Sequence, residues 1–304
     1  MKFFRARISP VENLTFIAMM VGFDAILSLI SALLPLSSIF IMLIAPLLSA
    51  AVSLFCKKRY LAIYVIAGIG ICIAITAWNF LNTLFYMIPA LITGLVYGLL
   101  WKAKLPASAN VFLSSLLSLA FFYLSILLIR GLLSADMVQV LLTFVGRGDD
   151  PGAKTIFPLF ALGYSYAQTG IMHAFVSYQI ARLGHEENEQ PKMRLWYPIF
   201  SIVFLIPALI LAFLQPSIAY LFLGLGIYWF ICSCFLLFDL KKPLPAIGVV
   251  LSLVSTLFFF AGLHQSMPPY SSLLLLSAPL LLASIILLIT AFVYRNKGQE
   301  NAAE

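Results

Sequence analysis

Ten long apolar segments follow one another along the chain, each ended by a short polar stretch or a proline. A helix that crosses a membrane needs about 20 consecutive, predominantly apolar residues, and each segment is about that long. The segments are residues 14–34, 36–55, 60–78, 83–101, 107–130, 156–181, 195–214, 217–238, 244–263 and 270–293. The pattern predicts an all-α fold, a polytopic integral membrane bundle of about ten transmembrane helices. Pro35 and Pro216 stand in connections so short that we expect tight antiparallel hairpins there.

The basic residues test this count independently. Of the 18 Lys and Arg residues, only Arg130, Arg147 and Lys154 fall after an odd-numbered segment, which leaves 15 before the first segment or after even-numbered ones. Loops rich in Lys and Arg stay on the cytoplasmic side of a membrane. We therefore expect both termini in the cytoplasm and the chain in a cell inner or plasma membrane.

The composition excludes several classes of protein. The chain has 304 residues, of which 63% are hydrophobic and 10% charged, whereas soluble domains carry about 25% charged residues. A water-soluble enzyme, a nucleic-acid-binding domain and a disordered chain are excluded, because no soluble fold has enough interior for this apolar surface. The net charge of +7 follows from the topology, so the expected partner is the lipid bilayer and not nucleic acid.

Two polar segments divide the chain. Residues 185–191 read as a cytoplasmic linker between a six-helix unit, residues 1–184, and a four-helix extension, residues 192–297. The tail, residues 298–304, is expected to be disordered. The outer loop at residues 146–155 is either a solvated turn or a cap over an outward-facing cavity.

Asp24 is the only carboxylate well inside a predicted span. Burying a charged, unpaired carboxylate in a membrane costs at least a few kcal/mol, so Asp24 should face the bundle or a cavity. It is either a functional group, which binds a cationic solute or carries a proton, or a structural hydrogen-bonding residue. His173 is its candidate partner, and alternatively a satisfied structural donor.

Further polar residues lie toward the same outer half. Tyr166, Thr169 and His173 share one face of the sixth segment and would line a pocket. Asn79 and Asn82 mark the turn between the third and fourth segments, where amides either cap helices or contact a ligand. The predicted substrate-binding residues are Asp24, Asn79, Asn82, Tyr166, Thr169 and His173.

Small residues form a second pattern. Ala18, Gly22 and Ala25 lie on one face of the first segment, and Gly94 and Gly98 form a G-x-x-x-G pair in the fourth. Small residues let helix backbones approach closely. Two interpretations stay open, namely internal packing and an external face on which a partner protein docks.

The first six segments resemble the substrate-binding S components of energy-coupling-factor transporters. The resemblance lies in six helices with a cytoplasmic amino terminus, the Ala18-x-x-x-Gly22 stripe, the Pro35 hairpin and residues 87–98. With its extra helices, the whole chain is similar to the YybS-like bacterial membrane family of the same superfamily. The resemblance implies a pocket open to the outside for a vitamin or other micronutrient. It also implies docking of the small-residue face on a membrane coupling protein driven by cytoplasmic ATPases.

Two classes of function follow. The favoured one is uptake of a small solute by an S-component-like protein. The alternative is a non-transport membrane protein, either a scaffold of the cell envelope or division machinery or an embedded enzyme acting on lipid-linked substrates. An enzyme is disfavoured, because the predicted membrane interior has no acidic pair and no His–carboxylate cluster. We expect no catalytic residue, cofactor or metal, since the four cysteines show no metal-ligand spacing.

Overall fold

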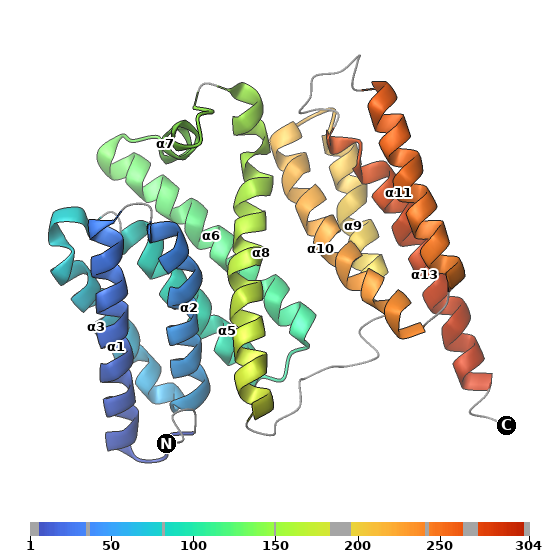
Figure 1. Ribbon diagram of the computed structural model, residues 1–304. Helices are drawn as coiled ribbons and strands as arrows, with labels where there is room; N and C mark the ends of the chain where they lie inside the picture. The colour runs from blue at the N-terminus through green and yellow to red at the C-terminus, as the bar shows by residue number, and fades with distance from the viewer. Residues whose placement is uncertain are drawn as a thin grey trace. The chain divides into compact units, whose positions relative to one another are not determined.

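The computed structural model describes residues 6–34, 37–80, 83–148, 150–182, 196–240, 243–263 and 273–300. These parts of the chain are helical and contain no strand (Figure 1). In chain order the elements are α1 (Pro10–Leu33), α2 (Ser37–Phe55), η1 (Lys58–Tyr60), α3 (Leu61–Ile75), η2 (Ala77–Asn79), η3 (Thr83–Met87), α5 (Ile88–Lys102), α6 (Ala107–Leu133), α7 (Met137–Phe144), α8 (Pro151–Arg182), α9 (Trp196–Leu211), α10 (Pro216–Leu240), α11 (Pro243–Leu263) and α13 (Ser277–Glu300).

The all-α prediction is confirmed, and each of the ten predicted segments overlaps a described helix. Among the described residues, five helices are long and apolar enough to cross a membrane, namely Pro10–Leu33, Lys58–Ile75, Thr83–Lys102, Ala107–Leu133 and Pro216–Phe235. Shorter apolar helices are Ile44–Phe55, Trp196–Leu211, Ala246–Ser255 and Ser277–Val293. Such helices are typical of a membrane protein.

The helix ends differ from the predicted ends where polar residues act locally. α1 begins at Pro10, because Ser9 and Glu12 form a capping box in which the Ser9 hydroxyl accepts from the Glu12 N–H at 3.1 Å. α7 lies in a stretch for which no helix was predicted. α13 continues to Glu300, into the tail predicted to be disordered. Residues 301–304, the predicted linker 185–191 and Pro35 lie outside the described residues.

The chain forms two compact units. The N-terminal unit comprises Met1–Met137 and Ala161–Glu189, and the C-terminal unit comprises Val138–Phe160 and Gln190–Glu304. One boundary falls inside the predicted linker. The others fall inside the predicted six-helix unit, so α7 and the first turns of α8 belong to the C-terminal unit.

In the N-terminal unit, α2 and α5 make the most extensive helix contact. A Cβ atom at Gly94 would overlap the Pro46 carbonyl oxygen, and one at Gly98 would overlap the Ser53 hydroxyl. Gly94 and Gly98 are buried in this internal interface, so their assignment to external partner docking is wrong. Their lack of side chains allows the two backbones to meet. Around this contact the core includes Phe16, Ile17, Met20, Val21, Val52, Tyr64, Leu91 and Leu95.

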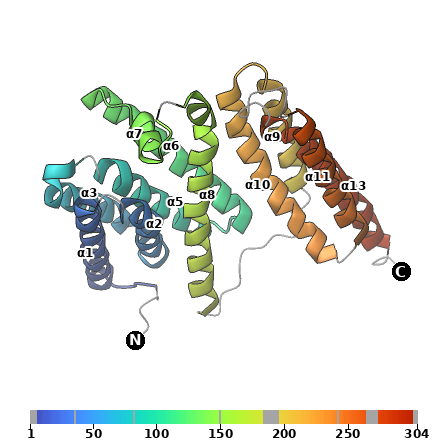
Figure 2. The same cartoon turned by 45° about the horizontal axis from the view of Figure 1, so that its top comes forward.

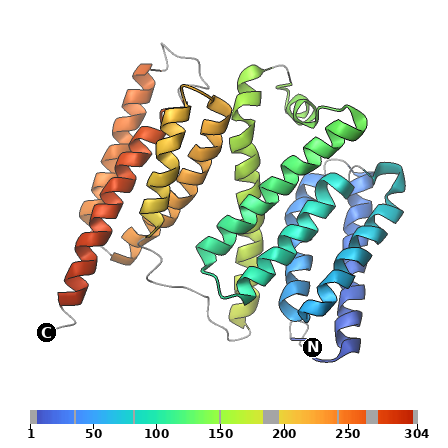
Figure 3. The same cartoon turned by 180° about the vertical axis from the view of Figure 1, so that it is seen from behind.

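In the C-terminal unit, α9 and α10 form the antiparallel hairpin predicted at Pro216, which begins α10 (Figure 2). α13 packs against α9 and α11, as the view from behind shows (Figure 3). The Ser201 hydroxyl lies 2.8 Å from that of Ser284 and donates to the Gly226 carbonyl oxygen at 3.1 Å. The buried core of this unit includes Leu205, Ala208, Tyr220, Leu223 and Leu274.

Candidate functional site

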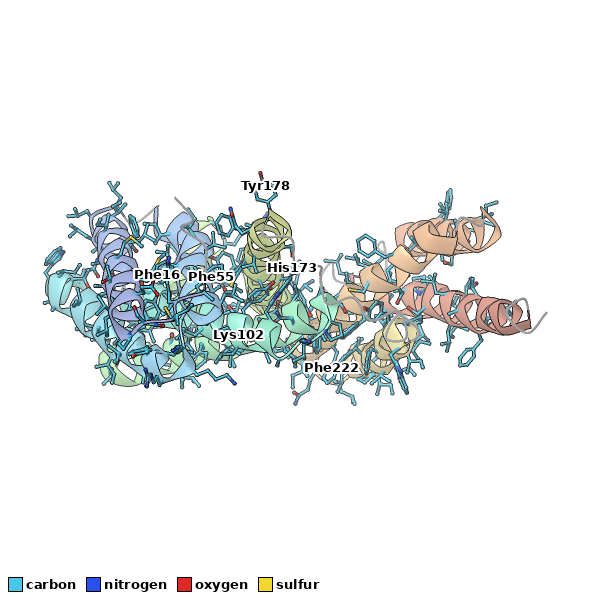
Figure 4. All side chains as sticks on the ribbon, turned by 90° about the horizontal axis from the view of Figure 1, so that it is seen from below. Phe16, Phe55, Lys102, His173, Tyr178 and Phe222 are labelled. Atoms are coloured by element: carbon cyan, nitrogen blue, oxygen red, sulfur yellow. The ribbon has the colours of Figure 1, made fainter. Side chains whose placement is uncertain are left out.

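The N-terminal unit has two chemically different ends, because its helices alternate in direction. At one end, which we call the basic end, α1 and α3 begin and α2 and α5 finish. It carries Arg7, Lys57, Lys58, Arg59 and Lys102. Figure 4 looks onto this end. The opposite end carries η2 with Asn79 and the exposed Trp78.

A polar cluster lies between α1, α3 and η3 in an otherwise apolar region. Its residues, which we call the Asp24 group, are Asp24, Ser28, Tyr64, Cys72, Thr76 and Thr83, and each is 0% exposed. On α1 the polar positions are four residues apart, and on α3 they are separated by multiples of four. Because residues four apart share one face of a helix, two polar stripes face each other across the α1–α3 contact.

Only one of the two Asp24 carboxylate oxygens is hydrogen-bonded to a described residue. The Tyr64 hydroxyl donates to Asp24 Oδ2 at 2.5 Å, while Asp24 Oδ1 is buried and has no hydrogen-bond partner among the described residues. A carboxylate offers about four acceptor positions. Leaving a buried polar atom unsatisfied costs about 1–3 kcal/mol, and more when the group is charged. Asp24 Oδ1 is therefore a hydrogen-bond acceptor to which no described residue donates.

A row of hydroxyl groups continues from the level of Asp24 toward the end that carries Trp78. Ser28 Oγ lies 3.2 Å from Thr83 Oγ1, which lies 2.5 Å from Thr76 Oγ1. Thr76 Oγ1 in turn donates to the Cys72 carbonyl oxygen at 2.6 Å. Thr83 opens the π-helical turn η3, a departure from α-helix that is frequent at functional sites.

A second polar cluster lies between α5, α6 and the part of α8 in the same unit. The Tyr97 hydroxyl lies 2.8 Å from His173 Nδ1, and the Ser115 and Thr169 hydroxyls are 2.5 Å apart. Ser118 donates to the Gln168 side-chain oxygen, also at 2.5 Å. These side chains satisfy one another, so this cluster stabilises helix packing.

The structure separates the predicted substrate-binding residues. Asp24 faces the bundle interior, as predicted, but its partner is Tyr64 and not His173. α2 lies between α1 and α8 in Figures 1 and 2, and His173 pairs with Tyr97.

The other predicted residues are also dispersed. Thr169 is fully buried in the second cluster, and Tyr166 is partly exposed. The Asn79 amide donates to the Ala32 carbonyl oxygen at 3.4 Å, so it caps α1. Asn82 lies outside the described residues.

The loop at residues 146–155 belongs to the C-terminal unit and begins α8. Asp150 Oδ1 accepts from the Gly152 N–H at 2.8 Å, and the exposed Arg147 guanidinium lies 3.5 Å from the same carboxylate. These contacts are those of a helix-starting turn, and they agree with the solvated-turn interpretation.

Sequence reasoning missed Tyr64, Ser28, Thr76 and Thr83. The signal was present in the spacing, because Tyr64, Cys72 and Thr76 recur at multiples of four in one apolar segment, as Asp24 and Ser28 do in another. Two polar stripes on consecutive antiparallel helices predict a shared polar interface.

The small-residue stripe of α1 points away from the core. Ala18 and Gly22 are exposed and Ala25 is partly exposed. Apart from the adjacent residues and the backbone of α1 itself, no described atom lies within 4 Å of the position that a Gly22 Cβ would take. This face of α1 is therefore open for contact with lipid or protein.

A groove in the N-terminal unit and a search for metal-binding groups complete the description of the site. A shallow groove with an empty volume of about 240 Å³ lies toward the basic end, lined by Leu47, Ala51, Leu54, Phe55, Phe175, Val176 and Gln179. Its lining is almost entirely apolar and contains none of the Asp24 group. Among the residues searched, no group of three or more His, Cys, Asp or Glu is placed to hold a metal ion.

No family model, curated protein or solved structure matches this chain.

Proposed function

We propose that this chain is a ten-span protein of the inner or plasma membrane that binds a small solute and takes part in its uptake, with an S-component-like N-terminal part. The observation that carries the proposal is Asp24, a fully buried carboxyl group inside an apolar helix with one oxygen unpartnered among the described residues. Ionisable groups inside membrane helices are costly and mark ion or substrate sites.

The position of Asp24 supports a site reached from outside. At a rise of about 1.5 Å per residue, Asp24 is about 21 Å from Pro10 and about 14 Å from Leu33 along α1. If the basic end is cytoplasmic, Asp24 lies near the middle of the membrane. The hydroxyl row then leads from Asp24 to the outer face.

The topology can be tested by cysteine labelling of intact cells, starting from a variant without native cysteines. We expect Trp78→Cys to react with a membrane-impermeant maleimide, and Lys57→Cys to react only after the membrane is permeabilised. Reporters fused to either terminus should be active only if cytoplasmic. An external carboxy terminus would require an odd number of spans and would contradict the proposal.

Solute binding can be tested by purifying the wild type and Asp24→Asn in parallel and comparing the bound small molecules by mass spectrometry. Hydrogen bonds to charged groups contribute about 1.5–3 kcal/mol, so we expect at least tenfold less of one compound on Asp24→Asn. Asp136→Asn, which changes an exposed carboxyl group between α6 and α7, is the matched control. Equal retention by all three proteins would refute a solute site at Asp24.

The open face of α1 supports the partner that the proposal requires, a membrane coupling protein with cytoplasmic ATPases. The exposed Ala18 and Gly22 leave the α1 backbone accessible to another helix. The same face would also serve a cell-envelope scaffold, the alternative function. Solute retention that depends on Asp24 separates the two, because a scaffold has no need of it.

A further inference from the structure

We infer that Asp24 exchanges a proton with the outer side of the membrane through the hydroxyl row of Ser28, Thr83 and Thr76. The link between this exchange and solute uptake rests on the proposed function. The exchange itself is a separate property of the N-terminal unit, and it is measured without any solute.

The burial of Asp24 limits which ligands can reach it. Asp24 and Tyr64 are both 0% exposed, so an organic solute would reach the carboxyl group only after α1 and α3 separated. A proton needs no cavity and travels between hydrogen-bonded oxygen atoms. While α1 and α3 stay together, the chemistry open to an enclosed carboxyl group beside a row of hydroxyl groups is therefore reversible protonation.

The hydrogen bonds of the row have a defined direction. Each hydroxyl group has one proton to donate, and that of Thr76 goes to the Cys72 carbonyl oxygen. Thr83 must therefore donate to Thr76, which leaves Ser28 to donate to Thr83. Ser28 Oγ also shares a hydrogen bond with the Cys72 thiol, which leaves one lone pair to accept from the Asp24 side.

Asp24 lies one helical turn before Ser28 on the same face of α1. Asp24 Oδ1 has no hydrogen bond among the described residues, and side chains four residues apart on a helix have Cβ atoms about 5–6 Å apart, so we place one water molecule between Asp24 and Ser28. When the proton leaves Asp24 Oδ1, Ser28 receives one proton and passes its own to Thr83. Thr83 passes one to Thr76, which turns its own hydroxyl from the Cys72 carbonyl oxygen and gives that proton to water that reaches the outer end. The products are the Asp24 carboxylate and one hydronium ion.

Tyr64 and Cys72 are the titratable side chains that face Asp24 from α3. Tyr64 donates to Asp24 Oδ2. α2 carries no titratable residue, and the one on η3, Tyr86, packs against Phe85. No described basic side chain contacts Asp24 to hold it permanently charged.

The experiment is infrared difference spectroscopy of the purified full-length protein in lipid nanodiscs, with the proton as the probe. We expect the carboxylic acid C=O band of a buried Asp to appear reversibly as the pH falls, to be absent in Asp24→Asn and to remain in Asp136→Asn. A band that does not change with pH, or that survives Asp24→Asn, overturns the inference.

The hydroxyl row is tested by the rate of the same signal after a rapid pH jump. Thr83→Val keeps the side-chain shape but removes the hydroxyl group, and we expect protonation at least tenfold slower with an unchanged midpoint. Thr143→Val, at an exposed threonine of the C-terminal unit, should leave the rate unchanged. Ser28→Ala makes the same test if Thr83→Val does not fold. An unchanged rate in the folded variant overturns the route through the row.

The two proposals fail differently. A titrating band in the wild type, together with equal solute retention by Asp24→Asn, refutes solute binding at Asp24 and keeps proton exchange. Solute retention that depends on Asp24, without a titrating band, refutes proton exchange and keeps the proposed function.

Discussion

A leucine at Gly98 is expected to destabilise the N-terminal unit severely, whereas a leucine at Gly22 is expected to leave its stability unchanged. A Cβ atom at Gly98 would overlap the Ser53 hydroxyl and lie 2.9 Å from the Ala50 carbonyl oxygen. Overpacking a core typically costs about 1–3 kcal/mol. Here we expect about 3 kcal/mol or more, because the obstacle includes backbone of α2 that cannot rotate away.

The matched control is Gly22→Leu, which places the same residue on the open face of α1. The two proteins are compared by thermal unfolding in detergent, followed by circular dichroism. Gly22→Leu should unfold at the same temperature as the wild type. It should lose any coupling protein that the wild type retains during purification. A Gly98→Leu protein as stable as the wild type would contradict the close contact of α2 and α5.

Tyr64→Phe is expected to destabilise the protein by about 1–3 kcal/mol, because it leaves the buried Asp24 carboxyl group without its donor. The double variant Asp24→Leu/Tyr64→Phe should be at least as stable as the wild type, since well-packed apolar residues often replace buried polar pairs without loss. Chemical unfolding of the wild type, Asp24→Leu, Tyr64→Phe and the double variant completes a double-mutant cycle.

A gain in stability with a loss of solute retention would identify the pair as one kept for activity at the expense of stability. If Tyr64→Phe unfolds like the wild type, the Asp24–Tyr64 hydrogen bond contributes nothing to stability. If the double variant is less stable than either single variant, the pair is a structural element of the core.

Much of the fold follows from local pattern. The apolar segments predict the helices, because a span must satisfy its own backbone hydrogen bonds wherever the surroundings are apolar. The Gly94–Gly98 spacing predicts a close helix contact, but not which helix fills it. That depends on the serines and Pro46 of α2, which lie far away in the chain.

The candidate site was less predictable than the fold. Asp24 stands out in the sequence because a carboxylate is rare in an apolar segment. Its pairing with Tyr64 depends on which faces of α1 and α3 meet, and this is a property of the assembled bundle. His173 shows the same limit, since its helix faces α5 and α6 and not α1.

The interlocked α2–α5 contact has a consequence for how the N-terminal unit could change conformation. The Ser49 and Ser53 hydroxyls fold back onto the Pro46 and Ala50 carbonyl oxygens, so the α2 surface against the α5 glycines is flat and tightly fitted. Helices joined this closely cannot slide past each other without backbone collision, and they must rock as one rigid body. Any motion that exposes Asp24 therefore falls to α1 and α3, whose outward-facing sides are free to shift within the lipid.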